Sequence, residues 1–335
     1  MTKPSVYVLC PETDRPSGGV KMLYRHADVL ARNGFKAAVL HQQRGFRCTW
    51  FANTTPVTYL PDVRLTVNDF LVIPEVFGPR TFSLSDIPAI GHACRKVIFN
   101  QNCYYTFLGH TFDSIMSPAF ALPYARPDEY IATIVVSEDS AAYMRFAFPG
   151  SRVFRIVNSI NTRLFTFSDQ KKPQICFMPR KHPEDAIQVL GLLRLRGKLD
   201  DFSVVPIDNA SEADVARIMR ESLIFLSFGY PEGFSLPPAE AMASGCIVIG
   251  YHGEAGREYF LDDLCCPIRV NDTVGFVTAI ESVIGNWKRD PAPVREMARR
   301  ASRHIHENYS AEREEMTILA VWRELMSVRT GTWFG

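Results

Sequence analysis

The stretch LIFLSFGYPEGFSLPPAEAMASGCIVIG, residues 223–250, reads as a strand, a loop, a short helix and a second strand. The apolar runs Leu223–Ser227 and Cys246–Gly250 have the length of buried strands. Between them, Ser235 stands at a helix N-cap, prolines fill the first turn, where no amide donor is needed, and Gly245 ends the helix. This order predicts two parallel strands joined by a helix, with the loop at the carboxyl end of the first strand.

The same alternation continues on both sides of this stretch. Further apolar runs, spaced to leave room for helices, are Val6–Cys10, Ala37–Leu40, Phe70–Ile73, Lys96–Phe99, Thr133–Ser137, Val153–Val157, Ile175–Met178, Ser203–Ile207 and Leu264–Ile268. Residues 19–33 have apolar residues at helical spacing and are followed by Gly34, a suitable C-terminal cap. Strands that are apolar on both faces indicate parallel sheets covered by helices, so the predicted class is α/β with Rossmann-like domains.

The chain length predicts two domains. At roughly 150 residues per domain, 335 residues allow two cores. The polar segment 166–173 separates an N-terminal domain, residues 1–165, from a C-terminal domain, residues 174–310. A charged helical tail, residues 311–335, is expected to pack back on the N-terminal domain. Two such domains that face each other would bind a ligand in the cleft between them, beyond the carboxyl ends of their strands.

Composition excludes several classes of protein. Apolar residues make up 47% and charged residues 22%, as in globular proteins, and 37 basic against 36 acidic residues lack the basic excess of a nucleic-acid binder. No apolar run reaches the ~18 residues of a membrane span, and the first one is too short for a signal peptide. The eight cysteines form no C-x-x-C pair and indicate reduced thiols. The predicted location is the cytoplasm, and peripheral association with the inner face of the membrane stays open.

Two loops that follow strands are suited to phosphate. Gly18 and Gly19 let backbone amides approach an anion at a helix start, although a tight turn would need the same residues. Their spacing is not G-x-G-x-x-G, which argues against a dinucleotide site. Arg180 and Lys181, directly after another strand, could bind a diphosphate or could form a solvated turn.

Two further loops add hydroxyl-binding groups. Glu232 lies in the loop of the opening stretch and Glu240 on the second turn of its helix, so carboxylates could bind hydroxyls while helix-start amides bind phosphate. A nucleotide sugar offers both groups, whereas the alternative for Glu240 is a surface helix residue. The glycine-rich segment 250–258 could form a cleft wall, and a lone loop histidine such as its His252 is more often structural than catalytic.

The third loop resembles the signature of retaining glycosyltransferases of the GT-B type, family four. Their Glu-x7-Glu motif corresponds to Glu232 and Glu240, and EGFSLPPAEAMASG follows the family pattern almost residue by residue. The likeness extends to Gly18-Gly19, to the segment 157–159 and to Gly256 with Glu258, and so covers nearly the whole chain.

The resemblance implies roles for these residues. Glu232 would contact the donor sugar, Glu240 the ribose, and Arg180 and Lys181 the diphosphate, while Gly19 would bind the phosphates through its backbone. The residues implied in donor binding are Gly18, Gly19, Arg180, Lys181, Glu232, Gly233, Phe234, Ser235, Leu236 and Glu240. Catalysis would rest on Glu232, Arg180 and Lys181.

The sequence departs from the family at two places. The family's diphosphate lysine usually stands five positions after the arginine, where this chain has Asp185, and Lys181 is adjacent to the arginine instead. A histidine that often contacts the sugar is replaced by Asn100, Gln101 and Asn102, which could contact the sugar or the acceptor. Amides exchange hydrogen bonds but do not titrate, so they supply no general base.

The expected activity is retaining transfer of a sugar from a nucleoside diphosphate sugar to an unidentified glycan or lipid-linked acceptor, in surface polysaccharide or glycoconjugate synthesis. No cofactor, metal or nucleic acid is expected, because cations occupy the position where a metal would neutralise the diphosphate. No carboxylate nucleophile is evident in the N-terminal half, which favours front-face displacement. A sugar-nucleotide epimerase of the same fold and a catalytically silent binding module remain alternatives.

Overall fold

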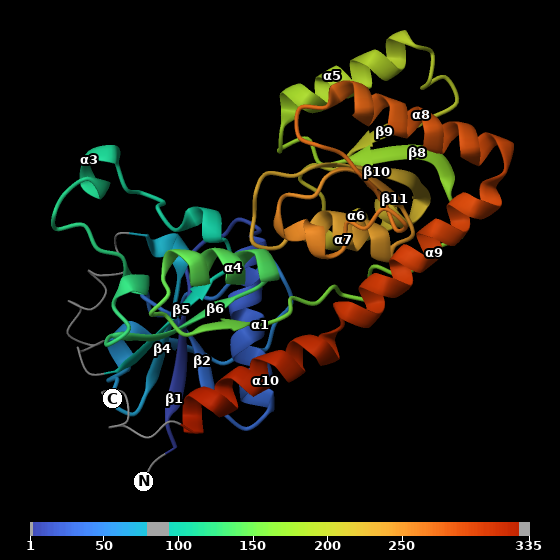
Figure 1. Cartoon of the computed structure of the whole chain (residues 1–335). Coiled ribbons are helices and arrows are strands. Elements are labelled where there is room, and N and C mark those ends of the chain that lie inside the picture. The colour runs from blue at the N-terminus through green and yellow to red at the C-terminus, as the bar shows by residue number, and fades with distance from the viewer. Residues whose placement is uncertain (1–2, 79–93, 328–335) are drawn as a thin grey trace. The chain divides into compact units, whose positions relative to one another are not determined.

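The computed structural model describes residues 3–78 and 94–327 (Figure 1). The chain forms two compact units, one of residues 1–157 with 314–335 and one of residues 158–313. The chain passes from the first unit to the second after Val157, which is earlier than the polar segment 166–173. Phe165 is buried, and Phe167 packs against the core of the second unit, so these side chains hold this part of the chain to that unit.

The first unit contains a seven-stranded sheet in the order β3-β2-β1-β4-β5-β6-β7. Its strands are β1 (Ser5–Leu9), β2 (Lys36–His41), β3 (Val57–Tyr59), β4 (Phe70–Pro74), β5 (Arg95–Asn100), β6 (Tyr130–Val135) and β7 (Val153–Arg155). All neighbouring strands are parallel, and Val8 of β1 pairs with Val39 on one side and Val72 on the other. Strand β4 is buried throughout, as expected for a sheet with both faces covered.

Helices of the first unit follow the strands. They are α1 (Gly18–Arg32), α3 (Phe112–Ile115) and α4 (Glu138–Ala147), with short 3-10 turns at Leu60–Asp62, Glu75–Phe77, Cys103–Tyr105 and Pro123–Ala125. Helix α1 begins after Ser17, whose hydroxyl accepts from the amide of Val20, and the chain turns at Gly34 with a φ of 79°. The buried residues of α1 include Val20, Leu23, Ala27 and Leu30, so the apolar spacing in the sequence predicted this helix correctly.

The last helix that the structure describes packs on α1. Helix α10 (Ala311–Ser327) buries Trp322, whose indole N–H donates to Nε2 of His26 at 2.7 Å. Burial lowers the pKa of His26 to about 3, which keeps the ring neutral and able to accept this bond. Glu314 of α10 forms an ion pair with Arg25 of α1.

The second unit contains a five-stranded parallel sheet in the order β12-β11-β10-β8-β9. The strands are β8 (Lys172–Phe177), β9 (Ser203–Pro206), β10 (Ser222–Phe228), β11 (Ile247–Tyr251) and β12 (Cys266–Pro267). The helices are α5 (Pro183–Leu195), α6 (Glu212–Glu221), α7 (Leu236–Ala243), α8 (Thr273–Arg289) and α9 (Pro291–Asn308), with a 3-10 turn at Ala255–Glu258. Figure 1 shows α5 and α8 on one face of the sheet and α6 and α7 on the other.

The predicted α/β class with two parallel sheets and C-terminal helices is confirmed. Strand β3 was not predicted, because its three residues are only half-buried and form no apolar run. The charged tail expected over residues 311–335 is helix α10 as far as Ser327, and residues 328–335 lie outside the described part of the chain. No helix in the described part of the chain is both long and apolar enough to cross a membrane.

Candidate functional site

Glu232 connects three of the four loops singled out in the sequence. Its amide donates to the carbonyl of Gly253 at 3.1 Å, which ties the third loop to the fourth. Its Oε1 accepts from Nζ of Lys181 at 2.5 Å and from the hydroxyl of Ser235 at 2.8 Å. The carboxylate therefore lies at the carboxyl end of β10 and is held by a cation, a hydroxyl and its own backbone.

The two predicted diphosphate cations have different environments. Lys181 is half-buried, with 35% of its side chain exposed beside a Glu232 side chain that is 22% exposed. Arg180 is exposed and makes no ion pair with any residue that the structure describes. A diphosphate would thus compete with Glu232 for Lys181, whereas Arg180 is available to it directly.

Ser235 occupies the N-cap position of α7, as predicted, but its hydroxyl does not cap the helix. The hydroxyl donates to Glu232, and the carbonyl of Ser235 accepts from the hydroxyl of Tyr259 at 2.5 Å. Pro237 and Pro238 carry no N–H, so the first turn of α7 offers few amide donors to a phosphate. A phosphate at this position would therefore depend more on the cations of the second loop than on the amides of this helix start.

The remaining donor candidates lie on the same loop and helix. Gly233 is buried, and Phe234 is buried between the rings of Tyr259 and Tyr309, with centroids 5.7 and 5.3 Å away. Leu236 begins α7 and Glu240 lies on its second turn, both half-buried. These residues lie on one loop and the helix that follows it, an arrangement that would suit a sugar and a ribose bound side by side.

The fourth loop is shaped by backbone strain. Gly253 has a φ of 60°, and a Cβ there would lie 2.7 Å from the carbonyl oxygen of Tyr230. Glu254 has a φ of 62° and pairs with Arg257. Nδ1 of His252 accepts from the amide of Glu254 at 2.9 Å, so the structural alternative for this histidine has direct support.

Asp185, which replaces the family lysine, has a structural partner. Its Oδ2 accepts from the hydroxyl of Tyr251 at 2.7 Å, which joins the first turn of α5 to β11. His182, the N-cap residue of α5, has a φ of 42°, and its ring lies 4.0 Å from that of Tyr230. No cation takes the place of the family lysine at position 185, which leaves Arg180 and Lys181 as the cations of this loop.

A second group of candidates lies in the first unit, at the carboxyl ends of β1 and β5. Gly18 and Gly19 are the first residues of α1, and Nε2 of Gln101 donates to the carbonyl of Gly19 at 3.1 Å. Asn102 caps the next turn by accepting from the amide of Tyr104 at 3.1 Å, and Nδ2 of Asn100 donates to the hydroxyl of Tyr124 at 2.8 Å. The three amides therefore serve different partners, and only Gln101 contacts the glycine loop among the bonds found.

Glu75 is a candidate residue that was not predicted from the sequence. It directly follows β4 and is 6% exposed, and the amides of Gln101 and Asn102 donate to its carboxyl group. Its Oε2 has no hydrogen-bond partner among the described residues. Burial raises the pKa of this carboxyl to about 7. A charged residue immediately after the apolar run Phe70–Pro74 was the available signal, and it corrects the view that the N-terminal half offers no candidate carboxylate.

This raised pKa predicts a pH dependence of stability. Below pH 4.5 Glu75 is protonated whether the chain is folded or not, between 4.5 and about 7 only the folded chain keeps the proton, and above about 7 neither does. The free energy of unfolding should therefore fall as pH rises through this window, by on the order of 3 kcal/mol, and then stay level. Glu75→Gln should abolish this fall. Urea unfolding of Glu75→Gln and of the unaltered protein at about pH 5 and about pH 8 tests this prediction. An equal change in the free energy of unfolding between the two pH values in both proteins would contradict it.

Comparison with known proteins finds relatives in sequence and in fold. A family model described as glycosyl transferase-like matches residues 177–320. An α-1,6-glucosyltransferase of Actinobacillus pleuropneumoniae serotype 7 (strain AP76) is 25% identical over 246 residues, which cover 72% of this chain and 71% of that protein.

Solved structures match the whole fold. Sucrose-phosphate synthase of Thermosynechococcus elongatus superposes with a TM-score of 0.66 at 13% identity and covers 97% of this chain and 100% of its own. Anabaena HepE in complex with UDP superposes with a TM-score of 0.64, also at 13% identity, with the same coverage of 97% and 100%. The likeness first read from Glu232, Glu240 and their surroundings is confirmed.

Proposed function

We propose that this chain, a glycosyltransferase of the GT-B type, moves a sugar from a nucleoside diphosphate sugar to a hydroxyl of a glycan or lipid-linked acceptor, with retention of configuration, in surface polysaccharide or glycoconjugate synthesis. The observation that carries the proposal is the Glu232 carboxylate held between Lys181 and Ser235 at the end of β10. UDP is the favoured nucleotide, because UDP and UDP-glucose are the ligands named for the Anabaena HepE structures.

The proposed donor site divides the ligand among its residues. Glu232 accepts hydrogen bonds from sugar hydroxyls, and Glu240 does the same for the ribose. Arg180 and Lys181 stabilise the charge that develops on the diphosphate as the glycosidic bond breaks. Lys181 already pairs with Glu232, so its ammonium group can bridge the sugar-binding carboxylate and the departing phosphate.

Front-face displacement is the proposed route to retention. A double displacement needs an ionised carboxylate that attacks the sugar. The carboxyl group of Glu75, at the end of β4, already accepts hydrogen bonds from the backbone amides of Gln101 and Asn102, which lowers the nucleophilicity of its oxygens. The leaving diphosphate, neutralised by Arg180 and Lys181, then assists the incoming hydroxyl.

The reaction is placed in the cytoplasm, next to the inner face of the membrane when the acceptor is lipid-linked. All eight cysteines are free thiols, and seven of them are buried. Free thiols in this number suit a reducing compartment.

Incubation of the purified protein with UDP-glucose and related UDP-sugars tests the function. We expect UDP release and sugar transfer that survive excess chelator, because cationic side chains do the work of a metal. Loss of activity with chelator and its rescue by magnesium or manganese would overturn the metal-independent site. Free isomerised UDP-sugar as the product would favour the epimerase, and UDP binding without any turnover would favour the silent module.

Arg180→Ala should weaken UDP binding by about 1.5–3 kcal/mol, roughly 10- to 150-fold, the value of hydrogen bonds to charged groups. The exposure of Arg180 argues against the larger loss that follows truncation of a buried pair. Calorimetry with UDP measures the change. Arg194→Ala, which removes another exposed arginine from the last turn of α5, is the matched control and should bind UDP normally. Equal affinity in both variants would remove Arg180 from the donor site.

A further inference from the structure

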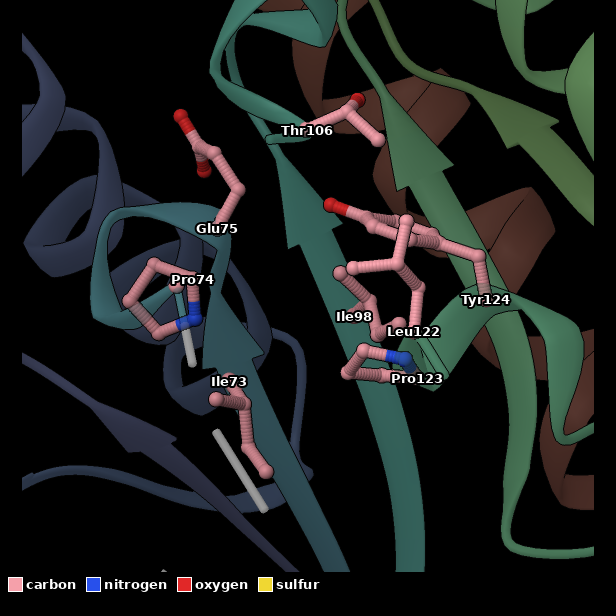
Figure 2. A pocket seen from close by; sticks show the side chains of 9 residues that line it. Ile73, Pro74, Glu75, Ile98, Thr106, Leu122, Pro123 and Tyr124 are labelled. Carbon is pink, nitrogen blue, oxygen red and sulfur yellow. The ribbon is translucent and has the colours of Figure 1, made fainter. Parts of the chain in front are cut away.

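A narrow cavity opens at the carboxyl ends of β4 and β5 in the first unit (Figure 2). Its lining residues are Ile73, Pro74, Glu75, Gly78, Ile98, Thr106, Leu122, Pro123 and Tyr124. The aliphatic and proline side chains form an apolar wall, and Figure 2 shows the polar ends of Glu75, Thr106 and Tyr124 gathered toward one end. All of these lining residues belong to the first unit.

Hydrogen bonds hold the cavity's polar side chains in place but leave some of their capacity unused. The amides of Gln101 and Asn102 donate to the carboxyl of Glu75, while its Oε2 has no partner in the described chain. Asn100 donates to the hydroxyl of Tyr124 through Nδ2, and its own buried Oδ1 is likewise unpartnered within residues 3–78 and 94–327. A buried oxygen without a hydrogen bond lowers the free energy of unfolding unless another molecule supplies a donor.

The backbone around the cavity is fixed. Gly78 has a φ of 50°, and a Cβ there would lie 2.5 Å from the carbonyl oxygen of Leu108. The hydroxyl of Thr106 donates to the carbonyl of Cys103 at 2.6 Å. The close approach of Gly78 to Leu108 brings the turn at Glu75–Phe77 against the segment after β5, and the bond of Thr106 lies within that segment.

The chemistry of the cavity selects a hydroxyl group. When Glu75 is ionised, a hydroxyl can donate to its Oε2, and when Glu75 carries its proton, the hydroxyl can accept from the carboxyl group. In either state the hydroxyl can accept from that of Tyr124, whose oxygen already accepts from Asn100 and whose proton is left to give. A cation is disfavoured, because burial raises the pKa of Glu75 to about 7 and so favours its uncharged form. Open α/β sheets bind their ligands at this edge, beyond the carboxyl ends of the strands.

We propose that Glu75 and Tyr124, whose hydroxyl is positioned by Asn100, form a subsite that binds one hydroxyl group of a pyranoside acceptor, the rest of the sugar lying outside the cavity. This inference rests on the proposed transfer to a hydroxyl acceptor and names the sugar class of that acceptor. A buried water satisfying the same atoms is the competing occupant.

The test follows the side-chain carboxyl carbon of Glu75 by NMR in protein labelled at its glutamates, with the resonance assigned by its absence in Glu75→Gln. The probes are methyl α-glucopyranoside, methyl α-galactopyranoside and the methyl α-glycoside of N-acetylglucosamine. We expect a saturable shift of the Glu75 resonance with at least one probe. Tyr124→Phe should weaken that binding at least fivefold, and Tyr105→Phe, at a tyrosine that is 43% exposed, should not.

Two results would overturn the subsite. No saturable response to any of the three probes would mean that the cavity holds a structural water only. A midpoint unchanged in Tyr124→Phe would mean that the probe binds elsewhere. Calorimetry with UDP separates this inference from the proposed function: Glu75→Gln and Tyr124→Phe should bind UDP as the unaltered protein does, and a protein that binds no UDP fails the proposed function whatever the NMR titration shows.

Discussion

Glu232→Ala should lower the rate of sugar transfer by about 100-fold or more and leave UDP binding intact. The lost carboxylate is the group proposed to hold the sugar, and removal of one positioned hydrogen-bonding group in an active site commonly costs two to three orders of magnitude in turnover. The structure adds a second expectation, since Lys181 pairs with Glu232 at 2.5 Å. Without Glu232 this ammonium is released to the diphosphate, so UDP affinity should be unchanged or slightly higher.

Steady-state kinetics with a UDP-sugar and calorimetry with UDP measure the two quantities. Glu240→Ala is the contrasting variant, because its carboxylate is assigned to the ribose and its loss should weaken UDP binding itself. Glu232→Gln keeps the size of the side chain and its bond to Ser235 but removes the charge, so it isolates the ion pair. Equal loss of UDP affinity in Glu232→Ala and Glu240→Ala would refute the division of roles.

The sheets and helices were predictable because their signals are local. Runs such as Phe70–Ile73 and Leu223–Ser227 are apolar on both faces, which only a covered parallel strand requires. The loop from Glu232 to Glu240 was also predictable, since glycine and proline fix its boundaries and its carboxylates have a recognisable spacing. What periodicity could not supply was the partner of each side chain.

The wrong predictions at the site concern which group each side chain binds. Ser235 was placed at the correct helix position, yet its hydroxyl binds Glu232, three residues earlier, in place of the helix amides. Lys181 was expected to be available to phosphate and instead pairs with a carboxylate 51 positions later in the chain. Glu75 was missed because its significance depends on burial and on amides from Gln101 and Asn102, which reach it only after β4 and β5 pair.

The largest expected effect on stability belongs to Gly250→Ala. Gly250 has a φ of 134°, and a Cβ there would lie 2.2 Å from the carbonyl oxygen of Ser227 and 2.8 Å from the ring of Phe276. Ser227 is its partner in the β10–β11 pairing, so the clash is with the backbone of the central strands and cannot be relieved by rotating a side chain. Positive φ adds strain for any residue with a Cβ. We expect the free energy of unfolding to fall by more than about 4 kcal/mol, a large part of the usual 5–15 kcal/mol.

Gly191→Ala is the matched control for this prediction. Gly191 lies within α5, and a Cβ there would have no heavy atom of the described chain within 4 Å outside its own neighbours and helix backbone. Because alanine loses less backbone entropy than glycine in a helix, this substitution should raise the free energy of unfolding by roughly 0.5–1 kcal/mol. Urea unfolding followed by circular dichroism compares the two variants with the unaltered chain. A Gly250→Ala protein with an unchanged midpoint would show that β10 and β11 can separate at little cost, and because β10 leads directly into the loop that holds Glu232, the geometry of the donor site would then have to be reconsidered as well.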